Sequence, residues 1–178
     1  MIRLFAAVAI PEEIGEGLAR RQQGLPGARW RPLESLHLTL RFFGELSEDK
    51  ADDLDAELAT IVGPVFDLTL SGVGVFEDTA GPRAAWAGAE DEPQLKRLAG
   101  RCESAARRAG LAADRRAFRA HVTLAYLAGA DPARVAAWVQ EHNLLKSPPF
   151  LVQAFGLYSS RRGEAGAIYR LERRYALA

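Results

Sequence analysis

The chain has 178 residues, of which 48% are hydrophobic and 26% charged, a composition typical of one globular domain with enough apolar material for a core. Lysine and arginine together number 23, as do aspartate and glutamate, so the net charge is near zero and a wholly basic surface for long nucleic acid is excluded. The single cysteine, Cys102, excludes an internal disulfide, and we expect it to be a buried, inert thiol.

Apolar periodicity and turn signals divide the chain into strands and helices. In chain order, we predict a strand at 3–10, a helix at 11–23, a strand at 36–43, a helix at 47–62, strands at 66–76 and 83–88, a helix at 93–109, a strand at 118–127, a helix at 131–142 and strands at 150–159 and 167–174. No apolar stretch approaches the length of a membrane span, and the first strand lacks the features of a signal peptide. We therefore expect a cytoplasmic protein without membrane contact.

One four-residue motif occurs twice, on two of the predicted strands. It reads His37-Leu38-Thr39-Leu40 in the first copy and His121-Val122-Thr123-Leu124 in the second. Because residues two apart on a strand share a face, each histidine lies beside its threonine while the apolar residues point into the core. The chain has 3 histidines, so this matched setting holds most of them. The repetition favours a shared function over two unrelated polar pairs on solvated sheet faces.

The surroundings of the two motifs are also alike, since each motif strand is followed by a helix and then by more strand. This indicates an internal duplication within a single domain over residues 1–178, with the motifs at 37–40 and 121–124. Helices that alternate with hairpin-like neighbouring strands favour a mostly antiparallel α+β fold. A pseudo-twofold axis between the copies would bring both polar faces into one central cleft.

Two imidazoles and two hydroxyls suit acid–base chemistry on a phosphate ester. An imidazole titrates at about pH 6.5, so one histidine can accept a proton from an attacking water while the other donates to the leaving oxygen. Strict alternation places Arg41 on the face of His37 and Arg119 on that of His121, where a guanidinium matches a phosphate, and Phe42 on the core-facing side. No metal-ligand spacing or Gly-rich phosphate loop is present, so we expect no cofactor.

Further conspicuous residues have plainer interpretations. His142 closes a predicted helix, where a cation suits the helix dipole, and we expect it to be structural. Trp30, Trp86 and Trp138 fit core or rim packing, with stacking on a base as the sharper possibility. Arginines gather near 107–108, 115–119, 161–162 and 170–174, and they form either a solvated face or a basic wall for RNA.

The paired motifs resemble those of the 2H phosphoesterases, and the flanking sequence resembles the RNA 2',3'-cyclic phosphodiesterase branch, once described as 2'-5' RNA ligases. The likeness is carried by Trp30 and by the segments 3–10, 36–45, 72–76, 82–86, 118–125 and 157–160. It implies a bilobal α+β fold in which two pseudo-twofold-related, mostly antiparallel sheets with outer helices form a central cleft that holds both motifs.

The resemblance also implies an activity, namely hydrolysis of a terminal 2',3'-cyclic phosphate on RNA, such as a tRNA fragment, to a 2'-phosphate without metal or cofactor. His37 is then the proton donor to the leaving 3'-oxygen and His121 the proton acceptor that activates water, while Thr39 and Thr123 hold the phosphate.

The chain departs from the family at two positions, one of which is Ala120, where a proline is common. Many relatives have Ala-Arg after the second motif, whereas this chain has Ala125-Tyr126, and Arg119 is the candidate to compensate. We assign Arg41, Phe42, Arg119 and Tyr126 to substrate binding.

The sequence is also compatible with three different activities. One is a phosphodiesterase for small cyclic nucleotides or 2'-5'-linked oligonucleotides, the second is a catalytically weakened RNA-end binding module, and the third is ligation, the same chemistry in reverse. Nothing in the sequence indicates a subunit interface, so we expect a monomer.

Overall fold

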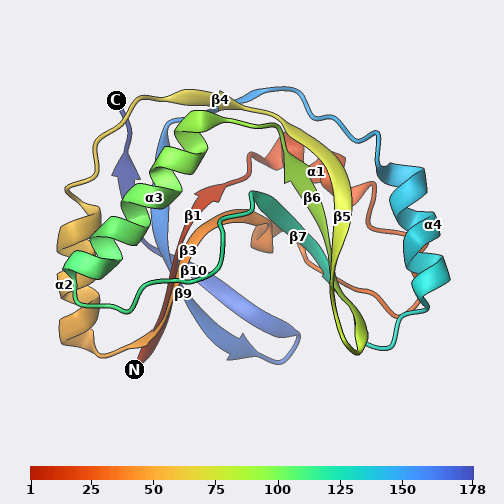
Figure 1. Ribbon diagram of the computed structural model, residues 1–178, viewed down its shortest axis with the longest axis horizontal. Helices are drawn as coiled ribbons and strands as arrows, with labels where there is room; N and C mark the ends of the chain where they lie inside the picture. The colour runs from red at the N-terminus through yellow and green to blue at the C-terminus, as the bar shows by residue number, and fades with distance from the viewer.

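A computed structural model describes all residues, 1–178. The strands bend into an arch, and the helices lie along its outer sides (Figure 1). The strands are β1 (Ile2–Ala9), β2 (Arg29–Trp30), β3 (His37–Leu46), β4 (Phe66–Leu68), β5 (Leu70–Asp78), β6 (Gly81–Ala89), β7 (His121–Tyr126), β8 (Phe150–Val152), β9 (Ala154–Gly163) and β10 (Gly166–Ala176). The helices are α1 (Glu12–Ala19), α2 (Glu48–Leu58), α3 (Pro93–Arg108) and α4 (Pro132–His142), with a 3-10 turn at Leu33–Ser35.

The main sheet is 8-stranded in the order β10-β9-β1-β3-β7-β6-β5, with β2 paired to β7. All of its strand pairs are antiparallel, and its two halves meet where β3 lies beside β7. A 2-stranded sheet of β4 and β8 crosses between the halves. The predicted α+β fold, with two antiparallel halves and outer helices, is confirmed. Apart from the short β2, the elements from β1 to β5 follow the order strand–helix–strand–helix–strand–strand. The elements from β6 to β9 follow the same order, so each motif strand has the same place in its half.

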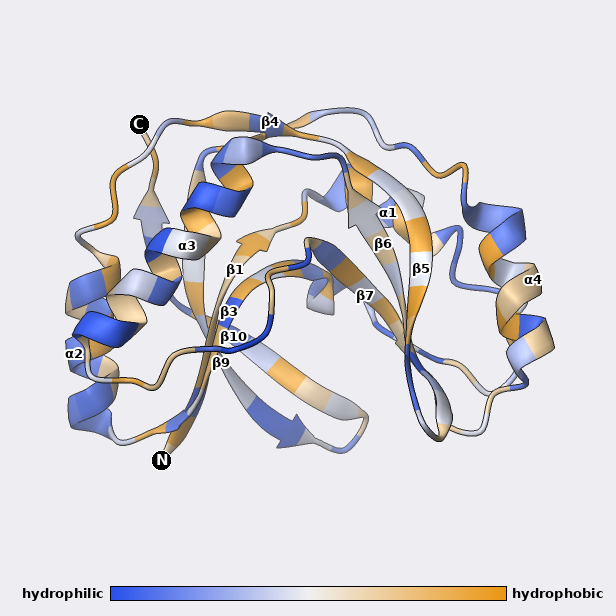
Figure 2. Cartoon of the chain, in the orientation of Figure 1, coloured by the Kyte–Doolittle hydropathy of each residue, from blue (hydrophilic) through white to orange (hydrophobic).

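The helices cover the convex sides of the two halves. Helices α2 and α3 pack on each other and on β1 and β3, whereas α4 packs on β5 and β6. In Figure 2 the helices carry blue and orange faces, as amphipathic surface helices do. The buried side chains form one cluster of 40 residues that includes Cys102, whose thiol pKa burial raises to about 12. None of the helices is long and apolar enough to cross a membrane.

Several predicted boundaries differ from the structure. The strands predicted at 66–76 and 150–159 are each divided, because their first residues pair as β4 with β8 and the rest enter the main sheet. The helix predicted at 11–23 ends at Ala19, and the strand predicted from residue 118 begins at His121. The two-residue β2 was not predicted, since its only support is pairing with the distant β7.

Candidate active site

A β-bulge in β3 decides which side chains of the first motif share a face. His37, Thr39 and Phe42 pair with alternate residues of β1, whereas Leu40 is skipped in the register and Arg41 pairs on the other face. The predictions that Arg41 shares the face of His37 and that Phe42 faces the core are therefore wrong. Phe42 is 49% exposed. The bulge shifts the alternation by one residue, which strict periodicity cannot anticipate.

The second motif has the same irregularity at the same place. His121, Thr123 and Tyr126 pair with alternate residues of β6, while Leu124 is skipped in the register and Ala125 pairs on the other face. Phe42 and Tyr126 thus hold equivalent positions, and both side chains turn towards the motif histidines.

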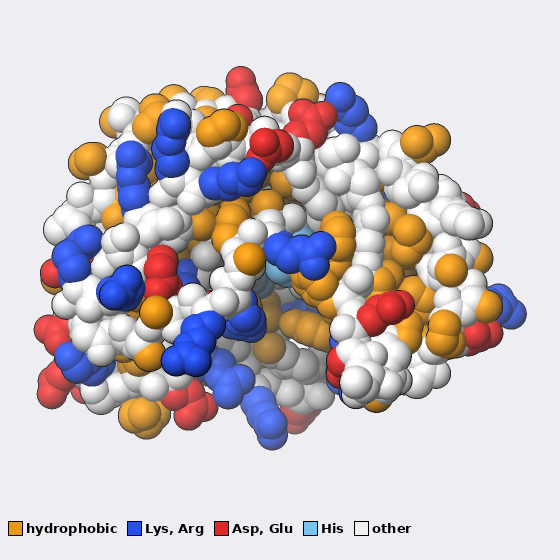
Figure 3. All heavy atoms as spheres, viewed as in Figure 1, with side chains coloured by type: hydrophobic (Ala, Val, Ile, Leu, Met, Phe, Trp, Pro, Cys, Tyr) orange, Lys and Arg blue, Asp and Glu red, His pale blue; other side chains and the backbone are white.

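Both motifs line one cavity of about 210 Å³, which we call the central cavity. Its lining residues are Arg31, Ser35, His37, Thr39, Phe42, Phe76, Ala84, His121, Thr123, Tyr126 and Tyr169. The antiparallel pairing of Leu38 with Val122 sets His37 across from Thr123 and Thr39 across from His121. Figure 3 shows a histidine side chain in a hollow at the middle of the molecule. Six of the predicted site residues therefore line one cavity, whereas Arg41 does not. The six are His37, Thr39, Phe42, His121, Thr123 and Tyr126.

The two imidazoles are oriented by the same backbone contact. Nδ1 of His37 lies 2.8 Å from the carbonyl oxygen of Ser35, and Nδ1 of His121 lies 2.7 Å from that of Arg119. A carbonyl oxygen only accepts, so Nδ1 carries the hydrogen in both rings. Nε2 is therefore left as the proton acceptor of each neutral imidazole.

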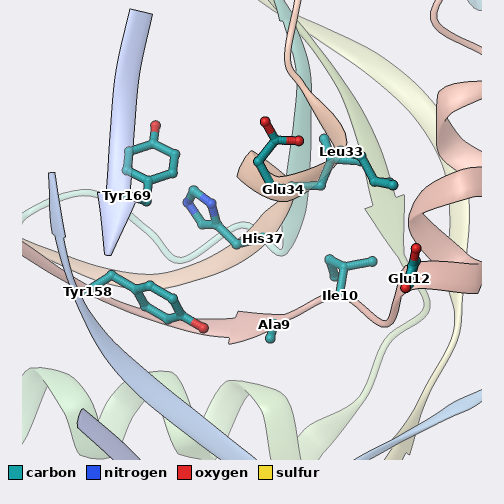
Figure 4. A pocket seen from close by; sticks show the side chains of 9 residues that line it. Ala9, Ile10, Glu12, Leu33, Glu34, His37, Tyr158 and Tyr169 are labelled. Carbon is teal, nitrogen blue, oxygen red and sulfur yellow. The ribbon is translucent and has the colours of Figure 1, made fainter. Parts of the chain in front are cut away.

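Aromatic rings surround both histidines. The ring of His37 lies 4.7 Å from that of Phe5 and 5.1 Å from that of Tyr169, and the ring of His121 lies 4.8 Å from that of Phe76. His37 also lines a second cavity, of about 320 Å³. Figure 4 shows its lining side chains, with Tyr158, Tyr169 and Glu34 around His37.

This apolar packing changes the acidity of the rings. Burial lowers the pKa of His37 to about 4, the hydrogen bond to Ser35 opposes this, and the charges of Arg31 and His121 lower it further. Burial also lowers the pKa of His121, the hydrogen bond to the carbonyl of Arg119 opposes this, and the charge of Arg119 lowers it further. Both rings are therefore neutral near pH 7 in the free protein.

The predicted arginines lie outside the central cavity. The guanidinium of Arg41 donates to Glu103, to the carbonyl of Phe42 and, at 2.7 Å, to the carbonyl of Ala112, so it ties β3 to α3 and the loop that follows. The guanidinium carbon of Arg119 lies 5.5 Å from the ring centre of Phe76. Both residues line a larger neighbouring groove of about 910 Å³.

This neighbouring space, which we call the aromatic groove, shares Thr39, Phe42, Phe76 and His121 with the central cavity. Its further lining residues are Leu40, Arg41, Lys96, Ala99, Gly100, Glu103, Asp114, Arg116, Ala117, Phe118 and Arg119. The groove thus continues the central cavity along a surface with three phenylalanines and several cations.

Sequence reasoning missed Arg31 and Tyr169. Arg31 reaches the cavity because β2 pairs with β7, and Tyr169 because the β9–β10 hairpin folds beside β1. Neither carries a local pattern that could have found it. No group of His, Cys, Asp or Glu side chains is arranged to hold a metal ion.

Known proteins share the sequence and the fold of this chain. A model of the 2'-5' RNA ligase superfamily matches residues 10–164. The RNA 2',3'-cyclic phosphodiesterase of Archaeoglobus fulgidus is 30% identical over 172 residues, which are 95% of this chain and 97% of that protein. The protein of the same name from Thermus thermophilus is 31% identical over an alignment of 193 positions, gaps included, that covers 99% of this chain and 90% of that protein. The crystal structure of E. coli LigT complexed with 3'-AMP superposes with a TM-score of 0.80 at 30% identity, covering 99% of this chain and 98% of that one.

Proposed function

The chain belongs to the 2'-5' RNA ligase superfamily, and on this premise we propose that it is an RNA 2',3'-cyclic phosphodiesterase that converts the cyclic end of an RNA into a 2'-phosphate. The observation that carries the proposal is the central cavity, in which two histidines and two threonines from β3 and β7 face one another. The names of the relatives supply the substrate class, and the chemistry of the cavity suits it.

The tautomers of the two rings leave Nε2 of each free to transfer a proton, and the resemblance to the 2H phosphoesterases assigns the acceptor role to His121 and the donor role to His37. A water attacks the phosphorus, Nε2 of His121 takes a proton from that water, and the bond from phosphorus to the 3'-oxygen breaks. A protonated His37 donates its Nε2 proton to that oxygen, so the phosphate stays on the 2'-oxygen. Each proton transfer is worth roughly 10²–10⁴ in rate.

The hydroxyls of Thr39 and Thr123 make no hydrogen bond to the protein and are free to donate to the non-bridging oxygens. The negative charge of the bound phosphate favours protonation of His37, which its apolar surroundings disfavour before substrate enters.

The aromatic groove favours RNA over a small cyclic nucleotide. A mononucleotide would occupy the central cavity alone, whereas an RNA chain would continue into the groove, where Phe42 and Phe76 offer rings for stacking. The guanidinium of Arg119 forms no ion pair with a carboxylate and is available to a backbone phosphate. We place the enzyme in the cytoplasm as a monomer.

The test uses a short RNA that ends in a 2',3'-cyclic phosphate, incubated in EDTA with the wild-type protein, His37→Ala and His121→Ala, with the 2'- and 3'-phosphate products separated. We expect a 2'-phosphate from the wild type alone. A 3'-phosphate product, or undiminished turnover by either variant, contradicts the mechanism. RNA binding without turnover by the wild type would indicate a binding module instead.

Two further substrates distinguish hydrolysis of RNA ends from action on small cyclic nucleotides and from ligation. We expect a 2',3'-cyclic mononucleotide to give a lower kcat/KM than the RNA, and an equal value would favour small cyclic nucleotides. Adding an RNA with a 5'-hydroxyl tests ligation, since that hydroxyl would replace water and leave a 2'-5' linkage.

A further inference from the structure

Arg31 is a buried cation at the central cavity, just after β2. It is only 8% exposed, and it lines the cavity together with both motif histidines. Its guanidinium carbon lies 5.4 Å from the ring centre of Tyr126 and 5.5 Å from that of Tyr169. Two aromatic rings therefore hold the cation in place.

The backbone of Arg31 is fixed to the bulge of the second motif. Its N–H donates to the carbonyl oxygen of Leu124 at 2.8 Å. Nε2 of Gln22 donates to the carbonyl oxygen of Arg31 at 2.8 Å and to that of Leu124 at 3.0 Å. Because the bulge at Leu124 also turns Tyr126 towards the cavity, one backbone feature positions both the cation and the ring that it contacts.

The charge of Arg31 has no anionic partner in the protein. Its Nη2 donates to the carbonyl oxygen of Ala167 over a long distance, 3.5 Å, and its other side-chain partner is the neutral phenol of Tyr169. A guanidinium has five N–H donors, and burying it without a counter-charge costs free energy. Arg41 is the contrast, because its donors are taken by Glu103 and by backbone carbonyls. Arg31 therefore presents a positive charge without a carboxylate partner to the central cavity.

We propose that Arg31 binds the non-bridging oxygens of the substrate phosphate and replaces the arginine that many relatives carry at the position of Tyr126. The inference rests on the proposed function for its substrate, a phosphate ester. The guanidinium of Arg31 contacts the ring of Tyr126, so a guanidinium from either position serves the same part of the cavity. A second arginine at 126 would repel Arg31, and a tyrosine supports the cation without adding charge.

Binding of inorganic phosphate, measured by calorimetry, tests the site without depending on turnover. We expect Arg31→Gln to weaken phosphate binding by about 10- to 100-fold, as for the loss of charge-assisted hydrogen bonds. Arg29→Gln is the matched control, because the guanidinium of Arg29 also lies over Tyr126, at 6.0 Å, but this residue is exposed and does not line the cavity. It should change the affinity by less than about 2-fold.

A second substitution separates a binding role from a structural one. In Arg31→Gln, adding Tyr126→Arg should restore phosphate affinity and lower the KM for cyclic-ended RNA. In the wild-type background, Tyr126→Arg should not improve either value, because it places two guanidinium groups together. Wild-type affinity in Arg31→Gln, or a failure of Tyr126→Arg to restore it in a folded double variant, overturns the proposal. If the wild type binds phosphate through Arg31 but does not hydrolyse cyclic-ended RNA, the proposed function is contradicted and the phosphate site at Arg31 stands.

Discussion

Leu38 pairs with Val122, and this is the one residue pair that joins β3 to β7. Both side chains are fully buried, and the motif residues on either side of them face the central cavity. This buried pair thus fixes the register between the two motif strands. No other residues of β3 and β7 are paired, and the central cavity lies beside this junction.

The first prediction concerns this junction. Leu38→Ala should lower the free energy of unfolding by about 2–5 kcal/mol, as buried leucines do, and should also lower kcat because the motif strands shift relative to each other. Leu58→Ala is the control, because Leu58 is equally buried but lies in α2, away from the cavity. At a temperature where both variants stay folded, equal kcat values would refute the coupling of the junction to catalysis.

The second prediction concerns the threonine hydroxyls. Thr39→Val and Thr123→Val keep the side-chain shape, and neither hydroxyl has a hydrogen-bond partner to lose, so the melting temperature should stay nearly constant. Each variant should lose roughly 10- to 100-fold in kcat/KM, as expected for one lost hydrogen bond to a charged oxygen. The serine variants retain the hydroxyl and should remain within a few-fold of wild type. A valine variant with wild-type kcat/KM would remove that threonine from the mechanism.

The third prediction is an acidic optimum for kcat/KM. The free enzyme must hold one protonated and one neutral histidine, but burial lowers the pKa of His37 to about 4 and also lowers that of His121. The protonated fraction falls as pH rises, so kcat/KM should decline from an optimum below about pH 6.5. The charged and titratable groups that line the cavities beside His37 are Arg31, His121, the carboxylates of Glu12 and Glu34, and the phenols of Tyr126, Tyr158 and Tyr169.

The pH profile of kcat provides the comparison, because it reports the enzyme–substrate complex. The bound phosphate should raise the pKa of the protonated histidine, so the alkaline limb of kcat should lie at higher pH than that of kcat/KM. Coincident limbs would mean that the phosphate does not sit beside the histidines. Arg31→Gln removes a positive charge that lowers the pKa of His37, so its kcat/KM limb should also move to higher pH.

Local patterns were sufficient to predict the fold class and the paired motifs. Strand periodicity identified His37 and His121 on shared faces with their threonines, because three consecutive residues of a strand alternate reliably. The same rule failed two residues later, at Arg41 and Phe42, because the bulge depends on the register with β1. No count along the motif strand reveals that register.

Contacts between distant segments could not be predicted from the sequence either, because they also depend on how the strands pair. Arg31 faces the cavity only because β2 pairs with β7 and Tyr169 arrives on a separate hairpin. The sequence around Arg31 shows an ordinary surface cation after a tryptophan. The identity of its neighbours is a property of the folded sheet.

The last prediction concerns His142, for which the sequence predicts a cation at the end of a helix. It is only 5% exposed, it packs on Trp138, and neither of its ring nitrogens has a hydrogen-bond partner. Burial lowers the pKa of His142, the charge of Glu141 opposes this, and Arg21 lowers it further. From the sequence, we expect a structural cation at the helix end. The structure instead shows a buried side chain that packs on Trp138 and is neutral in the folded protein near pH 7.

A histidine whose folded pKa is below its unfolded value of about 6.5 binds protons more readily when the chain unfolds. Its contribution to stability is complete above that pH and is lost as the pH falls towards the folded pKa. The test is the free energy of unfolding, measured by urea denaturation at about pH 8 and at about pH 5. This free energy should fall less between the two pH values in His142→Phe than in the wild type. The difference can reach about 1.4 kcal/mol for each pH unit. His37 and His121 titrate in the same direction in both proteins, so they cancel in this comparison. Equal losses in the two proteins would show that folding does not lower the pKa of His142.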